Sequence, residues 1–157
     1  MKTGIAILVV SESSLQLSLT IAKHLPGSNL YSSFESIFTD TIPSIATFLK
    51  EHFNRFEAFV FVGSLGICVR SIAPFITDKH TDPAIVNIDS TGKYIISVLS
   101  GHIGGANSLT KQIARITGGQ AVITTQSDNT DLWALDTLGK TYQWKETAHN
   151  ATMNKLI

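Results

Sequence analysis

The chain has 157 residues, of which 43% are hydrophobic and only 15% are charged, and its formal net charge is zero. This length fits one domain with its own core, and the low charge content argues against disorder and against a basic nucleic-acid surface. Any anionic ligand must be bound by local geometry, because the chain has no overall positive field. The one cysteine, Cys68, excludes a disulfide framework and a cysteine-rich zinc site, so we expect a reducing, cytoplasmic compartment.

The chain opens with the apolar run GIAILVV at residues 4–10. The run is too short to span a membrane, and it lacks the longer apolar region and cleavage site of a secretory signal. A continuous apolar run of this length is typical of a strand covered on both faces of a sheet. We therefore predict a buried first strand and no membrane partner.

Apolar residues at helical spacing follow the first strand, and they recur at residues 42–53. Serines before the first of these segments predict helix caps, and a Pro-Gly pair ends it. Thr41 and Pro43 predict the start of the second helix, because proline is tolerated in a first helical turn. A weak strand is predicted around Leu30.

A second buried strand, EAFVFVG at residues 57–63, precedes a helix that Pro74 limits. The segment PAIVNIDSTGKYIISVL, residues 83–99, has two apolar runs around DSTG and predicts a hairpin. A helix over residues 106–116 and a strand at AVITT follow. This order predicts an α/β fold with three layers: a mostly parallel sheet with an antiparallel hairpin insertion, and helices on both faces.

The pattern weakens from Leu138 onward. We predict an α/β domain over residues 1–138. Residues 139–157 are predicted to be a linker or the start of a following domain that this chain does not contain.

Two glycine-rich turns follow predicted strands and precede predicted helices: GSLG at residues 63–66 and SGHIGG at residues 100–105. In open α/β sheets, ligands bind beyond the carboxyl ends of the strands, where loops meet helix N-termini. Free N–H groups and the helix dipole make such turns receptive to carboxylates, phosphates and oxyanions. We expect one cleft at a single edge of the sheet, lined by both turns and by TTQSDNTD after the last strand, and an acidic ligand.

Neither turn matches a standard motif for nucleotide binding or ester hydrolysis. The dinucleotide fingerprint G-x-G-x-x-G, the phosphate loop ending in Gly-Lys-Ser/Thr and the hydrolase elbow G-x-S-x-G are absent from both. These absences argue against standard nucleotide-binding and serine-hydrolase functions.

His102 is the main candidate for proton transfer, because a histidine beside glycines at the start of a helix is suited to acid–base catalysis near neutral pH. It can act as a general base or acid, or bind a metal through one ring nitrogen; the alternative is a histidine with only local hydrogen bonds. The loop upstream gathers Asp78, Lys79, His80 and Asp82 within five positions. Such density occurs at functional sites and in plain solvated loops alike.

Polar residues near both turns complete the candidate set. Arg70, one turn beyond GSLG, can pair with a carboxylate, although an exposed helix arginine is the more ordinary interpretation. Asn107 can hold a polar ligand group or cap its helix, and Cys68 is expected in the core. The predicted substrate-binding residues are Gly63, Ser64, Gly66, Arg70, Lys79, Ser100, Gly101, Gly104, Gly105, Asn107, Thr125 and Asp128.

Three segments together resemble the cobalamin-biosynthesis protein CbiG family, the cobalt-precorrin-5A hydrolases: GSLGICVRSIAPF, DKHTDPAIVNIDSTGKYIISVLSGHIGGAN and AVITTQSDNTDLWALD. The resemblance runs from about Phe59 to Asp136, and residues 1–55 carry little of it. Family members are longer and have a further C-terminal domain, so we expect that this chain is a piece that needs another domain.

The resemblance implies a role in anaerobic cobalamin (vitamin B12) biosynthesis. Family members open the δ-lactone of cobalt-precorrin-5A and release acetaldehyde, which gives cobalt-precorrin-5B. No cofactor and no metal site of the protein are expected, because the substrate carries the cobalt. The expected partners are the tetrapyrrole (corrinoid) substrate, other corrin-pathway enzymes or the missing C-terminal domain, and a second copy in a homodimer, with no nucleic acid and no membrane.

On that chemistry, His102 is the candidate base that activates water, and the amides of Gly104 and Gly105 are candidate oxyanion donors. Loss of acetaldehyde resembles a retro-aldol step in which His102, His80 or Asp82 takes a hydroxyl proton; either histidine can instead contact the substrate's cobalt. The alternatives are a non-catalytic corrinoid-binding module that needs a further domain, a generic α/β domain for another anionic small molecule, and an oligomerisation domain.

Overall fold

The computed structural model describes residues 2–125. The chain divides into two compact units, Met1–Val122 and Ile123–Ile157, and the described helices and strands all lie in the first. The predicted ligand-binding residue Asp128 lies outside the described residues.

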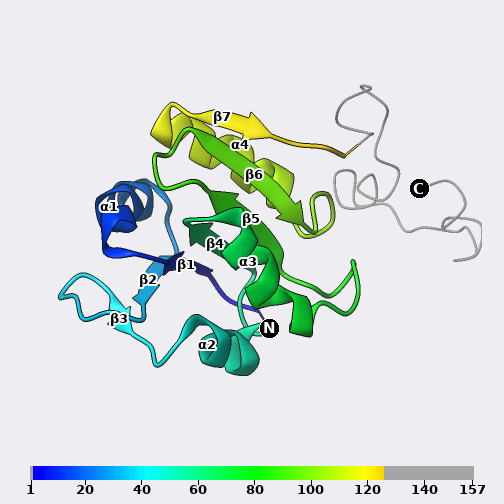
Figure 1. Ribbon diagram of the computed structural model, residues 1–157. Helices are drawn as coiled ribbons and strands as arrows, with labels where there is room; N and C mark the ends of the chain where they lie inside the picture. The colour runs from blue at the N-terminus through cyan, green and yellow to red at the C-terminus, as the bar shows by residue number, and fades with distance from the viewer. Residues whose placement is uncertain (1, 126–157) are drawn as a thin grey trace, which may run out of the picture. The chain divides into compact units, whose positions relative to one another are not determined.

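A seven-stranded sheet forms the centre of the first unit, in the order β3-β2-β1-β4-β5-β6-β7 (Figure 1). The strands are β1 Ile5–Val9, β2 Ser28–Ser32, β3 Asp40–Thr41, β4 Ala58–Val62, β5 Ala84–Ile88, β6 Tyr94–Leu99 and β7 Gln120–Val122. Every neighbouring pair is parallel except β5 and β6, which are antiparallel. The prediction of a mostly parallel sheet with a hairpin insertion is confirmed.

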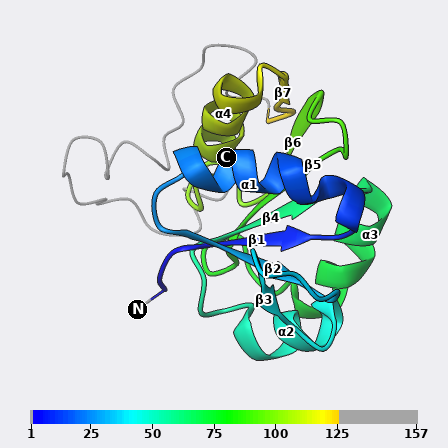
Figure 2. The same cartoon turned by 90° about the vertical axis from the view of Figure 1, so that its left-hand side faces the viewer.

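Helices cover both faces of this sheet (Figure 2). They are α1 Leu15–His24, α2 Ile45–His52, α3 Leu65–Ile72 and α4 Ala106–Thr117, with short 3-10 helices at Glu12–Ser14 and Ala73–Phe75. Side chains of α1 and α4 pack in one apolar cluster, and side chains of α2 and α3 pack in another. The three predicted layers are therefore present.

Strand β4 shows why the apolar runs form central strands. Successive side chains of a strand point to opposite faces. Val60 and Val62 accordingly pack on the α1/α4 side, and Phe59 and Phe61 on the α2/α3 side. All five residues of β4 are buried, as the unbroken apolar run predicts. Each fully buried side chain of this size stabilises the fold by about 1.5–3 kcal/mol.

The second helix begins later than predicted. Thr41 belongs to β3, and the backbone N–H of Ile42 donates to Ser32 O at 2.9 Å, so the chain is still extended there. Ser44 is the N-cap, and its side chain accepts from Thr47 N at 3.1 Å. The prediction that Thr41 starts this helix is wrong, because the cap is supplied three residues later and Pro43 lies ahead of it. The weak strand predicted around Leu30 is confirmed as β2.

The direction of β6 decides where its flanking loops lie. Ile95 of β6 pairs with Ile88, the last residue of β5, and Leu99 pairs with Ile85 near the start of β5. The chain therefore leaves β6 at the edge of the sheet where the parallel strands β4 and β5 begin. In the part of the chain that the structure describes, no helix combines the length and apolarity that a membrane crossing requires.

Candidate functional site

The two glycine-rich turns lie at opposite edges of the sheet. The turn at 63–66 follows the carboxyl end of β4, whereas the turn at 100–105 follows β6 and lies near the amino ends of β4 and β5. A strand of five residues spans roughly 17 Å, which separates the two edges. The expectation of one cleft lined by both turns is wrong, because β6 reverses the chain direction. We call the edge with the 63–66 turn the Gly63 end (residues 63–66 and 89–91). We call the opposite edge the His102 end (residues 77–82 and 100–105).

At the His102 end, the carboxylate of Asp82 holds its own loop in place. Asp82 is only 4% exposed. Its Oδ2 accepts from Thr77 N at 3.0 Å and from Asp78 N at 3.1 Å, and its Oδ1 accepts from Thr77 Oγ1 at 2.9 Å. These bonds occupy the carboxylate, so the geometry favours a positioning role for Asp82 over proton transfer.

The other charged residues of this loop are exposed. Lys79 and His80 face solvent, and the backbone N–H of His80 donates to Asp78 Oδ1 at 2.7 Å. The Nζ of Lys2 donates to Thr81 O, which ties the loop to the start of the chain. The loop thus has a fixed backbone that presents the His80 and Lys79 side chains outward.

The turn at 100–105 is packed tightly against itself. Ser100 has a φ of 57°, a left-handed conformation that is uncommon for residues other than glycine. A Cβ on Gly101 would lie 2.8 Å from Asn107 Oδ1, and a Cβ on Gly104 would lie 2.8 Å from Ser100 O. Glycine is needed at both positions for close packing.

The amides at the end of this turn and at the start of α4 donate to carbonyls of the turn. Gly105 N donates to His102 O at 3.1 Å, Ala106 N to Ser100 O at 3.1 Å and Asn107 N to Gly101 O at 3.0 Å. The expectation of a free oxyanion-binding N–H on Gly105 is therefore wrong, because the turn's own carbonyls satisfy the helix start. The role of Gly104 stays a prediction.

The two loops of the His102 end touch each other. Ser100 Oγ donates to Asp82 O at 3.2 Å, and the buried Asn107 accepts at Oδ1 from Ser97 Oγ at 2.7 Å. His102 is half-buried in the turn between these contacts. The structure thus brings the loops of the catalytic candidates His102, His80 and Asp82 to one edge of the sheet. Thr125 is the last residue that the structure describes.

At the Gly63 end, the turn leaves its helix start open. Gly63 has a φ of 156°, its N–H donates to Ile88 O at 2.8 Å, and a Cβ there would lie 2.8 Å from Val10 Cβ. Ser64 is the N-cap of α3, and its side chain makes no capping hydrogen bond. Among residues 2–125, no group accepts a hydrogen bond from the amides of Leu65 and Gly66. The first-turn amides of α3 are thus left without an acceptor in the described part of the chain, and ligand binding at this turn stays a prediction.

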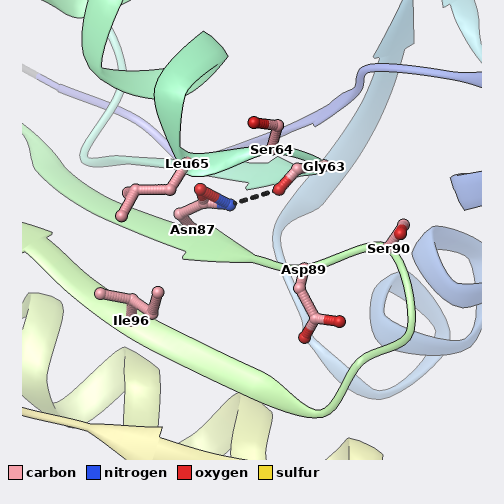
Figure 3. A pocket seen from close by; sticks show the side chains of 7 residues that line it. All are labelled: Gly63, Ser64, Leu65, Asn87, Asp89, Ser90 and Ile96. Carbon is pink, nitrogen blue, oxygen red and sulfur yellow. Dashed lines mark hydrogen bonds between the residues drawn. The ribbon is translucent and has the colours of Figure 1, made fainter.

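A pocket of about 180 Å³ lies beside this open helix start (Figure 3). Its lining residues are Gly63, Ser64, Leu65, Asn87, Asp89, Ser90 and Ile96. Sequence reasoning missed Asn87, although one polar residue inside the apolar strand AIVNI is a visible signal. Of the predicted ligand-binding residues, the structure places Gly63, Ser64, Gly66 and Arg70 at this end.

Two titratable groups near α3 have shifted pKa values. Burial raises the pKa of the Cys68 thiol to about 12, so this cysteine is no nucleophile at neutral pH. Partial burial opposes ionisation of Asp89, but hydrogen bonds from the Thr91 hydroxyl and from backbone amides of Tyr94 and Thr91 outweigh it and lower the pKa of this carboxyl. Asp89 therefore carries a negative charge at the pocket. Within residues 2–125, no group of three His, Cys, Asp or Glu side chains could hold a metal ion.

Comparison with known proteins identifies relatives of the chain. Residues 47–128, just over half of the chain, match the family described as Cobalamin synthesis G N-terminal. The chain is 48% identical over 89 residues to the cobalt-precorrin-5A hydrolase of Salmonella typhimurium, and 46% identical over 110 residues to that of Priestia megaterium. These alignments cover 57% and 69% of this chain but 25% and 29% of the relatives, so the chain spans about a quarter of their length.

A solved structure has a similar fold. It is a cobalamin biosynthesis protein G homologue from Sulfolobus solfataricus, which matches with a TM-score of 0.62 and 23% identity. The match covers 88% of this chain and 44% of that chain. At this identity the likeness supports the fold.

Proposed function

Because the chain belongs to the Cobalamin synthesis G N-terminal family, we propose that it forms part of a cobalt-precorrin-5A hydrolase and supplies the site that opens the lactone. The observation that carries this proposal is the identity of 46–48% to two curated relatives of that name. The family match over residues 47–128 includes the region in which Ser100 joins the His102 turn to the Asp82 loop. A biosynthetic role and a single cysteine also favour a cytoplasmic location.

The His102 end supports the first step of the proposed reaction. Water adds to the lactone carbonyl, the ring C–O bond breaks, and a carboxylate and a hydroxyl form. His102 takes the proton of the attacking water, because an imidazole is a suitable base near neutral pH. The N–H of Gly104 is the proposed donor to the developing oxyanion, and Asp82 positions the adjacent loop through its bonds to Thr77 and Asp78.

The second step removes the two-carbon fragment. A base takes the proton of the new hydroxyl, the adjacent C–C bond breaks, and acetaldehyde leaves. The electron pair of the broken C–C bond stays with the macrocycle, which takes up a proton there. The exposed His80 and the half-buried His102 are the candidate bases at this edge. The cobalt belongs to the substrate, and either histidine can contact it instead.

A second candidate function is favoured by the small share of the relatives that the chain covers. In this alternative, the chain is a corrinoid-binding module, and a further domain, another corrin-pathway enzyme or a second copy completes the catalytic site. The turn at residues 100–105 fits this alternative too, because the amides of Gly105, Ala106 and Asn107 already donate to its carbonyls and are not free for an oxyanion.

The test is an assay of acetaldehyde release from cobalt-precorrin-5A, with this chain and with a full-length relative. Replacing the base in His102→Ala should lower turnover by roughly 10²–10⁴-fold while the melting temperature is unchanged. His24→Ala is the matched control, because His24 is an exposed histidine on α1. Binding without product supports the module, near-normal turnover of His102→Ala removes His102 as the base, and absence of binding contradicts both functions.

A further inference from the structure

The side-chain amide of Asn87 is held at one end and unsatisfied at the other. Its Nδ2 donates to Gly63 O at 2.8 Å, to Ile88 O at 3.1 Å and to Phe61 O at 3.3 Å. Three carbonyl acceptors fix which atom of the amide is nitrogen. Asn87 is 1% exposed, and its Oδ1 has no hydrogen-bond partner. A buried acceptor without a donor costs free energy, so this oxygen calls for an explanation.

The unsatisfied oxygen lies beside the open start of α3. Figure 3 shows the amide with its nitrogen turned to Gly63 and its oxygen turned toward the first residue of the helix. The amides of Leu65 and Gly66 are the donors without an acceptor among the described residues. Leu65 and Asn87 both line the pocket, so the start of α3 and the unsatisfied oxygen border the same space.

Beside Asn87 the pocket disfavours an anion, although the Arg70 guanidinium lies near Gly66 at the helix start. Asp89 lines it as a carboxylate, and its oxygens already accept from Thr91 and from Tyr94 N at 2.6 Å. A second carboxylate would be repelled, and it would also bring no donor for Asn87 Oδ1. Leu65 and Ile96 supply apolar walls, which suit the carbon atoms next to a polar group.

We propose that this pocket binds the primary carboxamide group of a small molecule, whose NH₂ donates to Asn87 Oδ1 and whose carbonyl accepts from the first-turn amides of α3. A carboxamide carries the required donor and acceptor side by side and has no charge. Because Asn87 is buried, binding requires a lining side chain to move, and the proposal assigns this movement to Leu65, which is 41% exposed. The inference goes beyond the proposed function, because the pocket lies at the opposite edge of the sheet from His102.

The test is a titration of the ¹⁵N-labelled full chain with propionamide and, as the matched compound, propionate, followed by two-dimensional NMR. Propionamide should shift the Asn87 side-chain NH₂ and the Leu65 and Gly66 amide signals with saturation, and propionate should not. Absence of saturable shifts with propionamide overturns the proposal, and so do equal shifts with both compounds.

Two variants address the pocket separately. Asn87→Leu removes the acceptor and should weaken propionamide binding by about fivefold or more, the loss of one hydrogen bond. Leu65→Trp is the second variant, used if Asn87→Leu does not fold. It places a larger side chain at an exposed position of the pocket lining and should block the pocket without altering the core. Gln112→Ala on α4, which packs on the other face, is the control and should bind normally. Unchanged binding in Leu65→Trp overturns the proposal, and acetaldehyde release measured in parallel reports on the His102 end alone.

Discussion

The two glycine-rich turns are similar in sequence and differ in how they use their backbone. At the turn 100–105, the amides of Gly105 and of the first two residues of α4, Ala106 and Asn107, all donate to carbonyls of the turn. In the turn at 63–66, the amides of Leu65 and Gly66 have no acceptor among the described residues. After a glycine-rich turn, the amides at the helix start can therefore be bonded to the turn, which we call closed, or left without an acceptor, which we call open.

The glycines themselves serve different purposes at the two ends. Gly101 and Gly104 are required because a Cβ would meet Asn107 or Ser100 at 2.8 Å. At Gly66 the nearest atoms to a Cβ, on Arg70 and Ser64, are 3.8 Å away, so a methyl group fits. In the turn at 100–105 glycine allows close packing, whereas Gly66 leaves the start of α3 accessible.

The largest expected effect comes from adding one methyl group to each turn. Gly104→Ala forces its Cβ against Ser100 and should lower the free energy of unfolding by about 3 kcal/mol, as overpacking does. Gly66→Ala should leave it unchanged or raise it by up to about 1 kcal/mol, because alanine favours a helix. Urea unfolding of the two variants and of the unchanged chain measures the difference.

Equal stabilities of Gly104→Ala and Gly66→Ala would contradict the distinction between a closed and an open turn. Gly118→Ala is not a suitable control, because Gly118 has a φ of 73° and alanine would be strained there. Ser108→Ala in α4 is suitable, because Ser108 is exposed and lies one turn beyond the packed segment.

A smaller effect is expected from the loop that joins the closed turn. Asp82→Ala removes the acceptor for Thr77 N and Asp78 N and leaves these amides without a partner, so the free energy of unfolding should fall by about 2 kcal/mol. Asp78→Ala removes one exposed bond to His80 N and should cost less than about 1 kcal/mol. The two variants share a charge change, so a similar loss in both would show that Asp82 does not hold the loop.

The fold was predictable because its signals are local. The unbroken apolar run of β4 indicates a central strand, and DSTG between two apolar runs indicates the β5–β6 hairpin. The start of α2 was misplaced because Thr41 and Ser44 are both good caps, and only the pairing of β3 with β2 decides between them.

The position of the site was predicted less well. The hairpin itself implies that β6 leaves at the opposite edge from β4, so the single cleft was inconsistent with a feature that the sequence already predicted. The internal hydrogen bonds of the 100–105 turn depend on its dihedral angles, including the φ of 57° at Ser100. These angles cannot be predicted from the glycine content of the turn. The role of Asn87 depends on the carbonyls of Phe61 in β4, of Gly63 just after it and of Ile88 in its own strand, so it emerges only in the folded sheet.

The smallest expected effect concerns Asp89, which holds the hairpin at the open end. Its carboxylate accepts from Thr91 N at 3.0 Å and Tyr94 N at 2.6 Å, and these bonds lower its pKa in the folded chain. A carboxyl whose folded pKa lies below its unfolded value stabilises the fold fully above the unfolded pKa of about 4. That stabilisation is lost as the pH falls from there through the folded pKa, because the unfolded chain takes up the proton first. Asp89→Asn lacks this carboxylate, so the difference in free energy of unfolding between the unchanged chain and the variant should shrink as the pH falls below about 4. Ser90→Ala, in the same turn, is the control and should follow the pH dependence of the unchanged chain. A difference for Asp89→Asn that does not change with pH would mean that the stability of the hairpin does not depend on the ionised carboxylate of Asp89.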